Sequence, residues 1–202
     1  WRRDGVGFHQ RTALPIGDEA PAIYTPDDIF AGREPGDGPV LVYDGERYIM
    51  AGLIAEKLAQ DGHAVTLMTP DAMVSPWAEN TLEQHAIQRR ILEAGVSVMT
   101  SRRLVALENG ARHACVYTGR EADFEAASVV LVTSRISNDG LWRDLQARAE
   151  AEEAPWQSLT RIGDALAPAT VAHAVYAGHR YAREFDTPPT EGAPYLRERV
   201  TV

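Results

Sequence analysis

Cysteine is nearly absent from this sequence, because its 202 residues include only one, Cys115. A single thiol cannot form a disulfide within the chain, and it cannot supply the four thiolates of an iron–sulfur cluster or of a structural zinc site. The six histidines follow no spacing that is typical of metal ligands. We therefore expect no metal site within this chain. Because Cys115 falls in a predicted strand, we expect it to be a small core residue.

Long apolar runs and an excess of basic residues are also missing. No stretch approaches the roughly 20 apolar residues of a membrane-spanning helix, and the first residues lack the apolar core of a secretory signal. The formal net charge is −9, whereas binding to phosphates is dominated by clustered Lys and Arg. These absences argue against nucleic-acid and membrane partners, and they favour an acidic cytoplasmic protein.

The sequence does contain a strand–helix–strand pattern, in a composition with 45% hydrophobic and 24% charged residues that is typical of globular proteins. Residues 40–43 form a short apolar run, as in a strand buried in a parallel sheet. A helix with one apolar face is predicted over 48–60, and a second strand over 64–68. This arrangement has the size of a βαβ crossover.

Further predicted elements extend this pattern into an α/β fold. A short helix is predicted over 25–32 and another from Thr81, where Thr81 and Gln84 suit a capping box, to about residue 94. The remaining predictions are strands at 96–99, 128–133 and 159–162, an antiparallel meander over 104–124, and helices at 141–153 and 168–184. We expect a Rossmann-like three-layer unit with a central parallel sheet and a small antiparallel meander.

The turn after the first strand of the βαβ pattern decides whether this unit can bind a dinucleotide. No register of residues 44–52 gives the glycine pattern G-x-G-x-x-G. Counted from Gly45, the other two glycine positions hold Arg47 and Met50, whose side chains would fill the space that a pyrophosphate needs. Glu46 adds a negative charge at the same turn. We therefore predict a unit that does not bind NAD(P).

Gly163 and Asp164 lie where the last predicted strand leads into the last helix. Glycine allows the backbone to approach a ligand, and a carboxylate can accept hydrogen bonds from ribose or ribityl hydroxyls. A Gly–Asp pair is common, however, and the simpler role for Asp164 is to cap the helix. The residues alone leave both roles open.

Four segments stand out when they are taken in order: residues 1–7 (WRRDGVG), residues 40–68 with their glycine-poor turn, residues 130–135 (VLVTSR) and residues 162–168 (IGDALAP). Together they resemble the C-terminal region of a family of iron–sulfur flavoenzymes related to old yellow enzyme. The family includes trimethylamine dehydrogenase, histamine dehydrogenase and N-methylproline demethylase. In the third segment, Ser134 stands where the family pattern has glycine.

This resemblance implies that the chain is a non-catalytic part of a longer amine dehydrogenase or demethylase. Gly163 and Asp164 would border an ADP or FAD site whose glycine-rich first half precedes Trp1. An FMN-bearing barrel and the cysteines of a 4Fe-4S cluster would also lie upstream. In the parent, which we expect to be a homodimer, electrons from a small N-methylated amine would pass from FMN through the cluster to an electron-transfer flavoprotein.

The resemblance also implies a domain organisation. Residues 1–38 would connect from the FAD/ADP-type domain, and 39–150 would form a degenerate pyridine-nucleotide-like Rossmann domain. Residues 151–185 would be a returning strand and helix of the FAD/ADP-type domain, and 186–202 a tail without an assigned role. We expect no cofactor bound to this chain alone. Two alternatives remain open: part of an NAD(P)H-dependent enoyl reductase of the dienoyl-CoA type, and a non-enzymatic assembly module.

Overall fold

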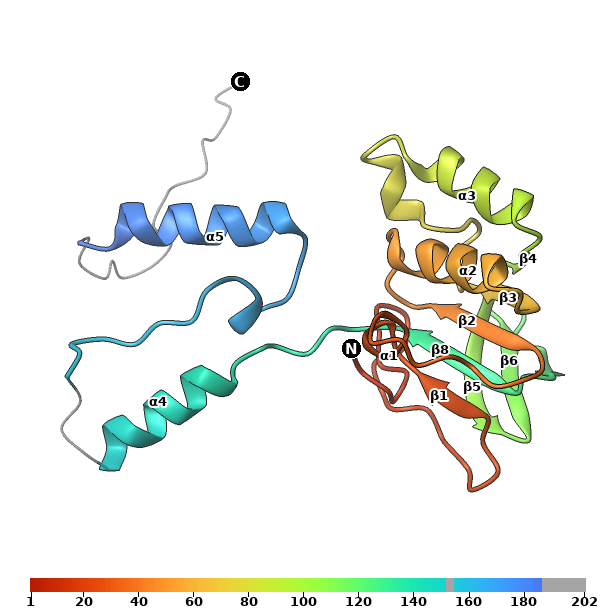
Figure 1. Ribbon diagram of the computed structural model, residues 1–202, viewed down its shortest axis with the longest axis horizontal. Helices are drawn as coiled ribbons and strands as arrows, with labels where there is room; N and C mark the ends of the chain where they lie inside the picture. Colours follow the sequence, from red (N-terminus) through yellow and green to blue (C-terminus); the bar gives the residue numbers. More distant parts are fainter. Residues whose placement is uncertain (152–154, 187–202) are drawn as a thin grey trace. The chain divides into compact units, whose positions relative to one another are not determined.

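A computed structural model describes residues 1–151 and 155–186 of the chain (Figure 1). The chain divides into two compact units, which meet between Arg135 and Ile136 and are described separately below. The domain boundaries expected from the sequence refer to a longer protein and stay predictions. The predicted tail, 186–202, lies outside the described residues except for its first residue.

Unit 1, residues 1–135, is built on a five-stranded parallel sheet. Its strand order is β1-β8-β2-β3-β4, and each pair of neighbours is parallel. The strands are β1 (Ala22–Tyr24), β2 (Val40–Asp44), β3 (Val65–Met68), β4 (Ser97–Met99) and β8 (Ser128–Val132). Every residue of β2 and β8 is buried, which explains why both strands have continuous apolar runs instead of an alternating pattern.

The two faces of this sheet support different layers. One face packs against α1 (Pro26–Phe30), α2 (Met50–Gln60) and α3 (Gln84–Glu93), and Figure 1 shows α2 and α3 on the same side of the strands. The other face packs against an antiparallel meander of β5 (Arg102–Glu108), β6 (Gly110–Cys115) and β7 (Glu121–Phe124). The predicted three-layer α/β fold with its small meander is confirmed.

Neighbouring residues of β2 show how one strand joins both cores. Val40 and Val42 belong to the core beneath the helices, whereas Leu41 and Tyr43 belong to the core beneath the meander. Side chains alternate between the faces of a strand, so an apolar run supplies both layers at once.

The helix starts agree with the sequence at α1 and differ at α3. A capping box is present at α1, and in it the Asp28 carboxylate accepts a hydrogen bond of 2.8 Å from the Thr25 amide. The Thr25 hydroxyl donates to the same carboxylate at 2.9 Å. The start predicted for α3 at Thr81 was wrong. A 3₁₀ turn, η1 (Pro76–Glu79), precedes it, and the Thr81 hydroxyl contacts Ala78 O and the Glu83 carboxylate instead of capping, so α3 begins at Gln84.

Unit 2 contains α4 (Gly140–Ala151), the 3₁₀ turn η2 (Gly163–Ala165) and α5 (Val171–Glu184). The two helices were predicted, but residues 159–162 form no strand in the part of the chain that the structure describes. A strand needs a neighbour to complete its ladder of hydrogen bonds. No described residue of unit 2 is buried, so the unit has no core of its own among these residues.

Candidate functional site

The carboxyl ends of β2 and β8 form the place where a Rossmann-like sheet normally binds a ligand. The chain leaves β2 towards β3 on one side, and β8 lies on the other side of β2. This change of direction is a topological switch point, and ligands of open α/β sheets bind in the crevice beyond it. The residues that follow these two strands are Gly45 to Ile49 after β2 and Thr133 to Arg135 after β8.

Asp44, the last residue of β2, is completely buried at this edge. Its Oδ1 atom accepts a hydrogen bond of 2.8 Å from the Arg47 amide, in a turn where Arg47 has the left-handed φ of 77°. Burial raises the pKa of the Asp44 carboxyl to about 7, and the nearby charges of Glu46 and Asp71 act in the same direction. The turn is thus held from inside by a carboxyl group that loses its charge easily.

Glu46 forms an ion pair with Arg135 across the switch point. The Glu46 side chain is only 13% exposed, and burial raises the pKa of its carboxyl. Arg135 and a hydrogen bond from the Met50 amide favour the charged form of the same carboxyl. Met50 is the first residue of α2, so a side chain of the protein lies at the helix end where a Rossmann fold places a phosphate.

Residues 1–8 run across the same edge. The amides of Arg2 and Ser134 bond the carbonyls of Ser134 and Val6, both at 2.9 Å, and the Phe8 amide donates to Gly45 O at 3.2 Å. A Cβ atom at Gly7 would lie 3.1 Å from Gly45 O, so the backbones are in close contact. This segment, which we call the strap (residues 1–8), covers the turn after β2.

Two arginines link the strap to the crevice. The guanidinium of Arg135 lies 4.8 Å from the ring centre of Trp1, and that of Arg47 lies 4.3 Å from the ring centre of Phe8. Such stacking favours a cation over an aromatic face. Together with the Glu46 ion pair, these contacts place the chain's own side chains at this edge. The prediction of a turn unsuited to NAD(P) therefore has a geometric basis beyond the missing glycines.

Gly163 and Asp164 lie in η2 of unit 2. Gly163 has a φ of +55°, and a Cβ there would meet nothing closer than 3.8 Å. The Asp164 side chain is exposed, and its Oδ1 accepts a hydrogen bond of 3.4 Å from the Ala169 amide. Asp164 precedes α5 by several residues, so it does not cap that helix directly. The assignment of both residues to an ADP or FAD site stays a prediction.

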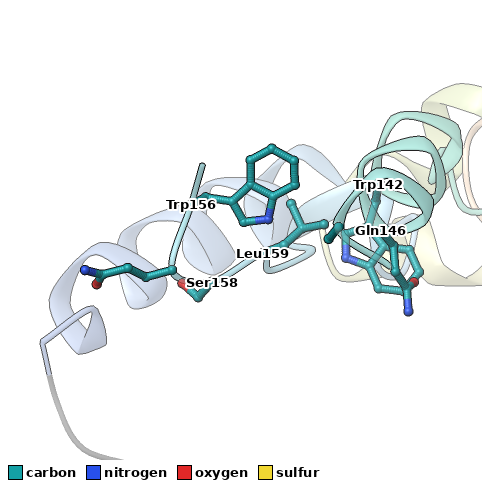
Figure 2. Close-up of a pocket in the computed structure, with 7 residues that line it drawn as sticks. Trp142, Gln146, Trp156, Ser158 and Leu159 are labelled. Atoms are coloured by element: carbon teal, nitrogen blue, oxygen red, sulfur yellow. The ribbon is translucent and has the colours of Figure 1, made fainter. Parts of the chain in front are cut away.

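Unit 2 also has an open groove of about 340 Å³ (Figure 2). It is lined by Trp142, Gln146, Ala149, Trp156, Gln157, Ser158 and Leu159. Trp142 carries the Arg161 guanidinium 4.2 Å from its ring centre, and Arg161 also pairs with Asp139 at 2.9 Å. The groove presents two indole rings and no cluster of ionisable groups, so its lining suits packing better than catalysis.

Cys115 ends strand β6 and is partly exposed, so the expectation of a core residue was wrong. Hydrogen bonds from the Thr118 hydroxyl and from nearby backbone amides lower the pKa of its thiol to about 7. Its place at the end of a strand, beside the turn into β7, explains the exposure. The strand position from which burial was expected does bury the preceding residue, Ala114.

The described residues supply neither a metal centre nor a membrane segment. Within residues 1–151 and 155–186, no three His, Cys, Asp or Glu side chains lie together so that they could hold a metal ion. Among the helices in these ranges, none combines the length and apolar character needed to cross a membrane.

Comparison with known proteins gives consistent relatives. Residues 24–121 match the family described as OYE-like second alpha/beta domain. Dimethylamine dehydrogenase of Hyphomicrobium sp. (strain x) is 31% identical over 221 residues, which cover 98% of this chain and 30% of the relative. Histamine dehydrogenase from Rhizobium sp. 4-9 is 42% identical, with a TM-score of 0.91 over 100% of this chain and 32% of that structure.

A third relative extends the same pattern. The 6-hydroxypseudooxynicotine amine oxidase HisD from Pseudomonas geniculata N1 is 34% identical, with a TM-score of 0.83 over 93% of this chain and 28% of that structure. The chain therefore spans about a third of the length of the relatives that it matches.

Proposed function

Since this chain belongs to the trimethylamine dehydrogenase-like family, we propose that it is the nucleotide-fold portion of an amine-oxidising flavoprotein. The observation that carries this proposal is the similarity to histamine dehydrogenase, which extends over 100% of the chain at 42% identity. The parent would oxidise a small amine at FMN and pass the electrons through a 4Fe-4S cluster to an electron-transfer flavoprotein. This portion would contribute structure and no catalytic residue.

The residues of this chain fit only part of that cofactor set. The sole cysteine excludes a 4Fe-4S cluster held by this chain alone, because such a cluster needs four thiolates. An ADP or FAD group fits better, since the open backbone at Gly163 and the exposed Asp164 carboxylate could receive a nucleotide and its hydroxyls. When bound in the parent, FMN would supply the electron acceptor for amine oxidation.

Unit 2 supports the idea that this portion completes a larger domain. Its described residues bury no side chain, and several large apolar ones are more than half exposed: Ile136, Leu141, Leu166, Val171, Val175, Tyr176 and Phe185. Exposed apolar groups of this extent indicate an interface. Because the relatives are about three times longer, we propose that upstream residues of the parent cover this surface.

The closed crevice in unit 1 argues against the alternative of an NAD(P)H-dependent enoyl reductase. The Glu46–Arg135 ion pair and the strap occupy the edge that would receive the pyrophosphate. An enzyme that delivers electrons to a protein acceptor has no need of this dinucleotide site. The other alternative, a non-enzymatic assembly module, is compatible with the role proposed for this chain. It does not apply to the parent, which we propose to be an enzyme.

Anaerobic titration of the full-length parent tests the proposed activity. We expect small secondary or primary amines to bleach the flavin absorbance. NADPH at the same concentration should leave the absorbance unchanged over the time that the amine needs to reduce the flavin. Electron-transfer flavoprotein should then reoxidise the parent. Rapid flavin reduction by NADPH together with no response to amines would instead establish the enoyl-reductase alternative.

Calorimetric titration with ADP tests the proposed nucleotide site at Gly163 and Asp164. In the full-length parent, Asp164→Ala should weaken ADP binding at least tenfold, because a nucleotide hydroxyl loses a charged acceptor. Asp144→Ala is the matched control, since Asp144 is another exposed acid of unit 2. Micromolar ADP binding by the 202-residue chain alone would contradict the view that the site needs upstream residues.

A further inference from the structure

The edge beyond the carboxyl ends of β2 and β8 already contains an anion, which the protein supplies. The Glu46 carboxylate faces the Arg135 guanidinium and the Met50 amide at the start of α2. An arginine and the amides of a helix N-terminus are two kinds of group that proteins commonly use to bind phosphate. We propose that Glu46 is an internal ligand that occupies a phosphate position, and that it keeps an external phosphate group out of this position.

Unpartnered polar atoms support a ligand crevice at this position. Four buried side-chain atoms of the described residues lack a hydrogen-bond partner, and three of them belong to Asp44, Glu46 and Ser75. Asp44 and Ser75 are completely buried. Asp44 ends β2, and its charge is favoured by a Ser75 amide from the loop after β3. Buried polar atoms are nearly always paired, so this concentration is typical of a functional crevice and unusual in a plain core.

The ion pair also differs from the surface pairs of the same unit. The Glu56–Arg90 pair joins α2 to α3 at 3.2 Å, away from the helix start, and its arginine is 44% exposed. Arg135 is 28% exposed and stacks on Trp1 of the strap. It also approaches Glu46 from the segment that follows β8, the strand on the far side of the switch point. The pair thus bridges the two strand ends between which a nucleotide would bind.

The strap limits how large an anion could bind at this position if Glu46 were removed. The Phe8 amide bonds Gly45 O at 3.2 Å, and Gly7 approaches the same carbonyl, so the strap leaves little room for a nucleoside. Inorganic pyrophosphate is therefore a better probe than NADH. This inference concerns the crevice alone and does not depend on the proposed amine oxidation.

Calorimetric titration of the intact protein with pyrophosphate at low ionic strength tests the proposal. Glu46→Ala removes the internal carboxylate and leaves Arg135 and the Met50 amide in place. We expect it to bind pyrophosphate at least tenfold more tightly than the unsubstituted protein does. Glu56→Ala is the matched control and should behave like the unsubstituted protein. The double variant Glu46→Ala/Arg135→Ala should lose the gained binding.

The opposite results would overturn the proposal. A folded Glu46→Ala variant that binds pyrophosphate no better than the Glu56→Ala control would show that Glu46 occupies no anion site. If Glu46→Ala does not fold, the unsubstituted protein provides the test by NMR. The chemical shift of the Met50 amide should change over the same pH range in which the Glu46 carboxyl titrates. A Met50 shift that stays constant through this range would refute the internal ligand. Since neither readout is enzymatic activity, failure here leaves the proposed function untouched.

Discussion

Arg47 and Asp71 form a two-point ion pair that joins the turn after β2 to the loop after β3. Arg47 Nε and Nη2 donate to Asp71 Oδ2 and Oδ1 at 2.9 and 3.0 Å. This geometry is among the stronger forms of carboxylate recognition, and both side chains are mostly buried. It also fixes Arg47 in a left-handed backbone conformation that a side chain rarely adopts.

Arg47→Ala should destabilise unit 1 by about 1–3 kcal/mol, because it leaves the Asp71 carboxylate without its main partner and retains the backbone strain. Arg47→Gly should cost less, since glycine relieves the strain at positive φ. Urea unfolding followed by circular dichroism measures both. Arg89→Ala is the control, because its pair with Glu93 is exposed and 3.8 Å long. Equal losses in Arg47→Ala and Arg89→Ala would contradict the role of the pair.

Unit 1 should lose stability as the pH rises from about 4 to about 7. The pKa of Asp44 is raised to about 7 in the folded chain, so the folded state holds a proton that the unfolded state has released. The stabilisation is complete below the unfolded pKa and is lost as the pH passes the folded one. One such group gives a slope of at most ~1.4 kcal/mol per pH unit.

Chemical unfolding at a series of pH values checks this slope. In Asp44→Asn the slope between these pH values should become shallower, because the titrating group is gone. Part of it should remain, since burial also raises the pKa of Glu46. A variant with an unchanged slope would show that Asp44 does not titrate in this range.

Gly52→Ala should destabilise the packing of α2 against α3 by about 1–3 kcal/mol, as expected for overpacking of a dense core. A Cβ at this position would lie 2.6 Å from Cγ2 of Ile87, which is itself buried. Thermal unfolding measures the loss. The double variant Gly52→Ala/Ile87→Ala should be more stable than the sum of the two single losses predicts, because the added methyl fills the vacated space. Simple additivity would refute the close contact.

Cys115 should react with iodoacetamide at half its maximal rate near pH 7. The thiolate is the reactive form, and hydrogen bonds from Thr118 lower the pKa of this thiol to about 7. Thr118→Ala should shift the midpoint upwards, towards the ordinary value for cysteine. Mass spectrometry of timed samples suffices, since the chain has one cysteine. An identical midpoint in both proteins would exclude the Thr118 hydroxyl as the cause.

The sequence predicted the elements whose pattern is local. The apolar runs of β2 and β8 are continuous because both faces of each strand are covered, and that signal needs no partner. Strand β1 was missed because it has only three residues and depends on pairing with β8, more than a hundred residues later. The start of α3 was misjudged because a short 3₁₀ turn competes for the Thr81 hydroxyl.

The candidate site shows the same limit. Glu46 was recognised from the sequence as an added negative charge in the turn. Its partner Arg135 lies 89 positions further on, and no local pattern relates the two residues. The strap could not be anticipated either, since only the folded sheet brings Phe8 against Gly45. The two residues meet because β2 and β8 are neighbours in the sheet, and the spacing of residues in the sequence does not reveal this neighbourhood.

The hydrogen bond from the Arg2 amide to Ser134 O joins two segments that lie far apart in the sequence. Because these residues are neighbours in space, the strap and the segment after β8 lie side by side at the carboxyl edge of the sheet. A displacement of either segment would therefore also disturb the turn after β2, which the Phe8 amide and the Arg135 guanidinium both contact.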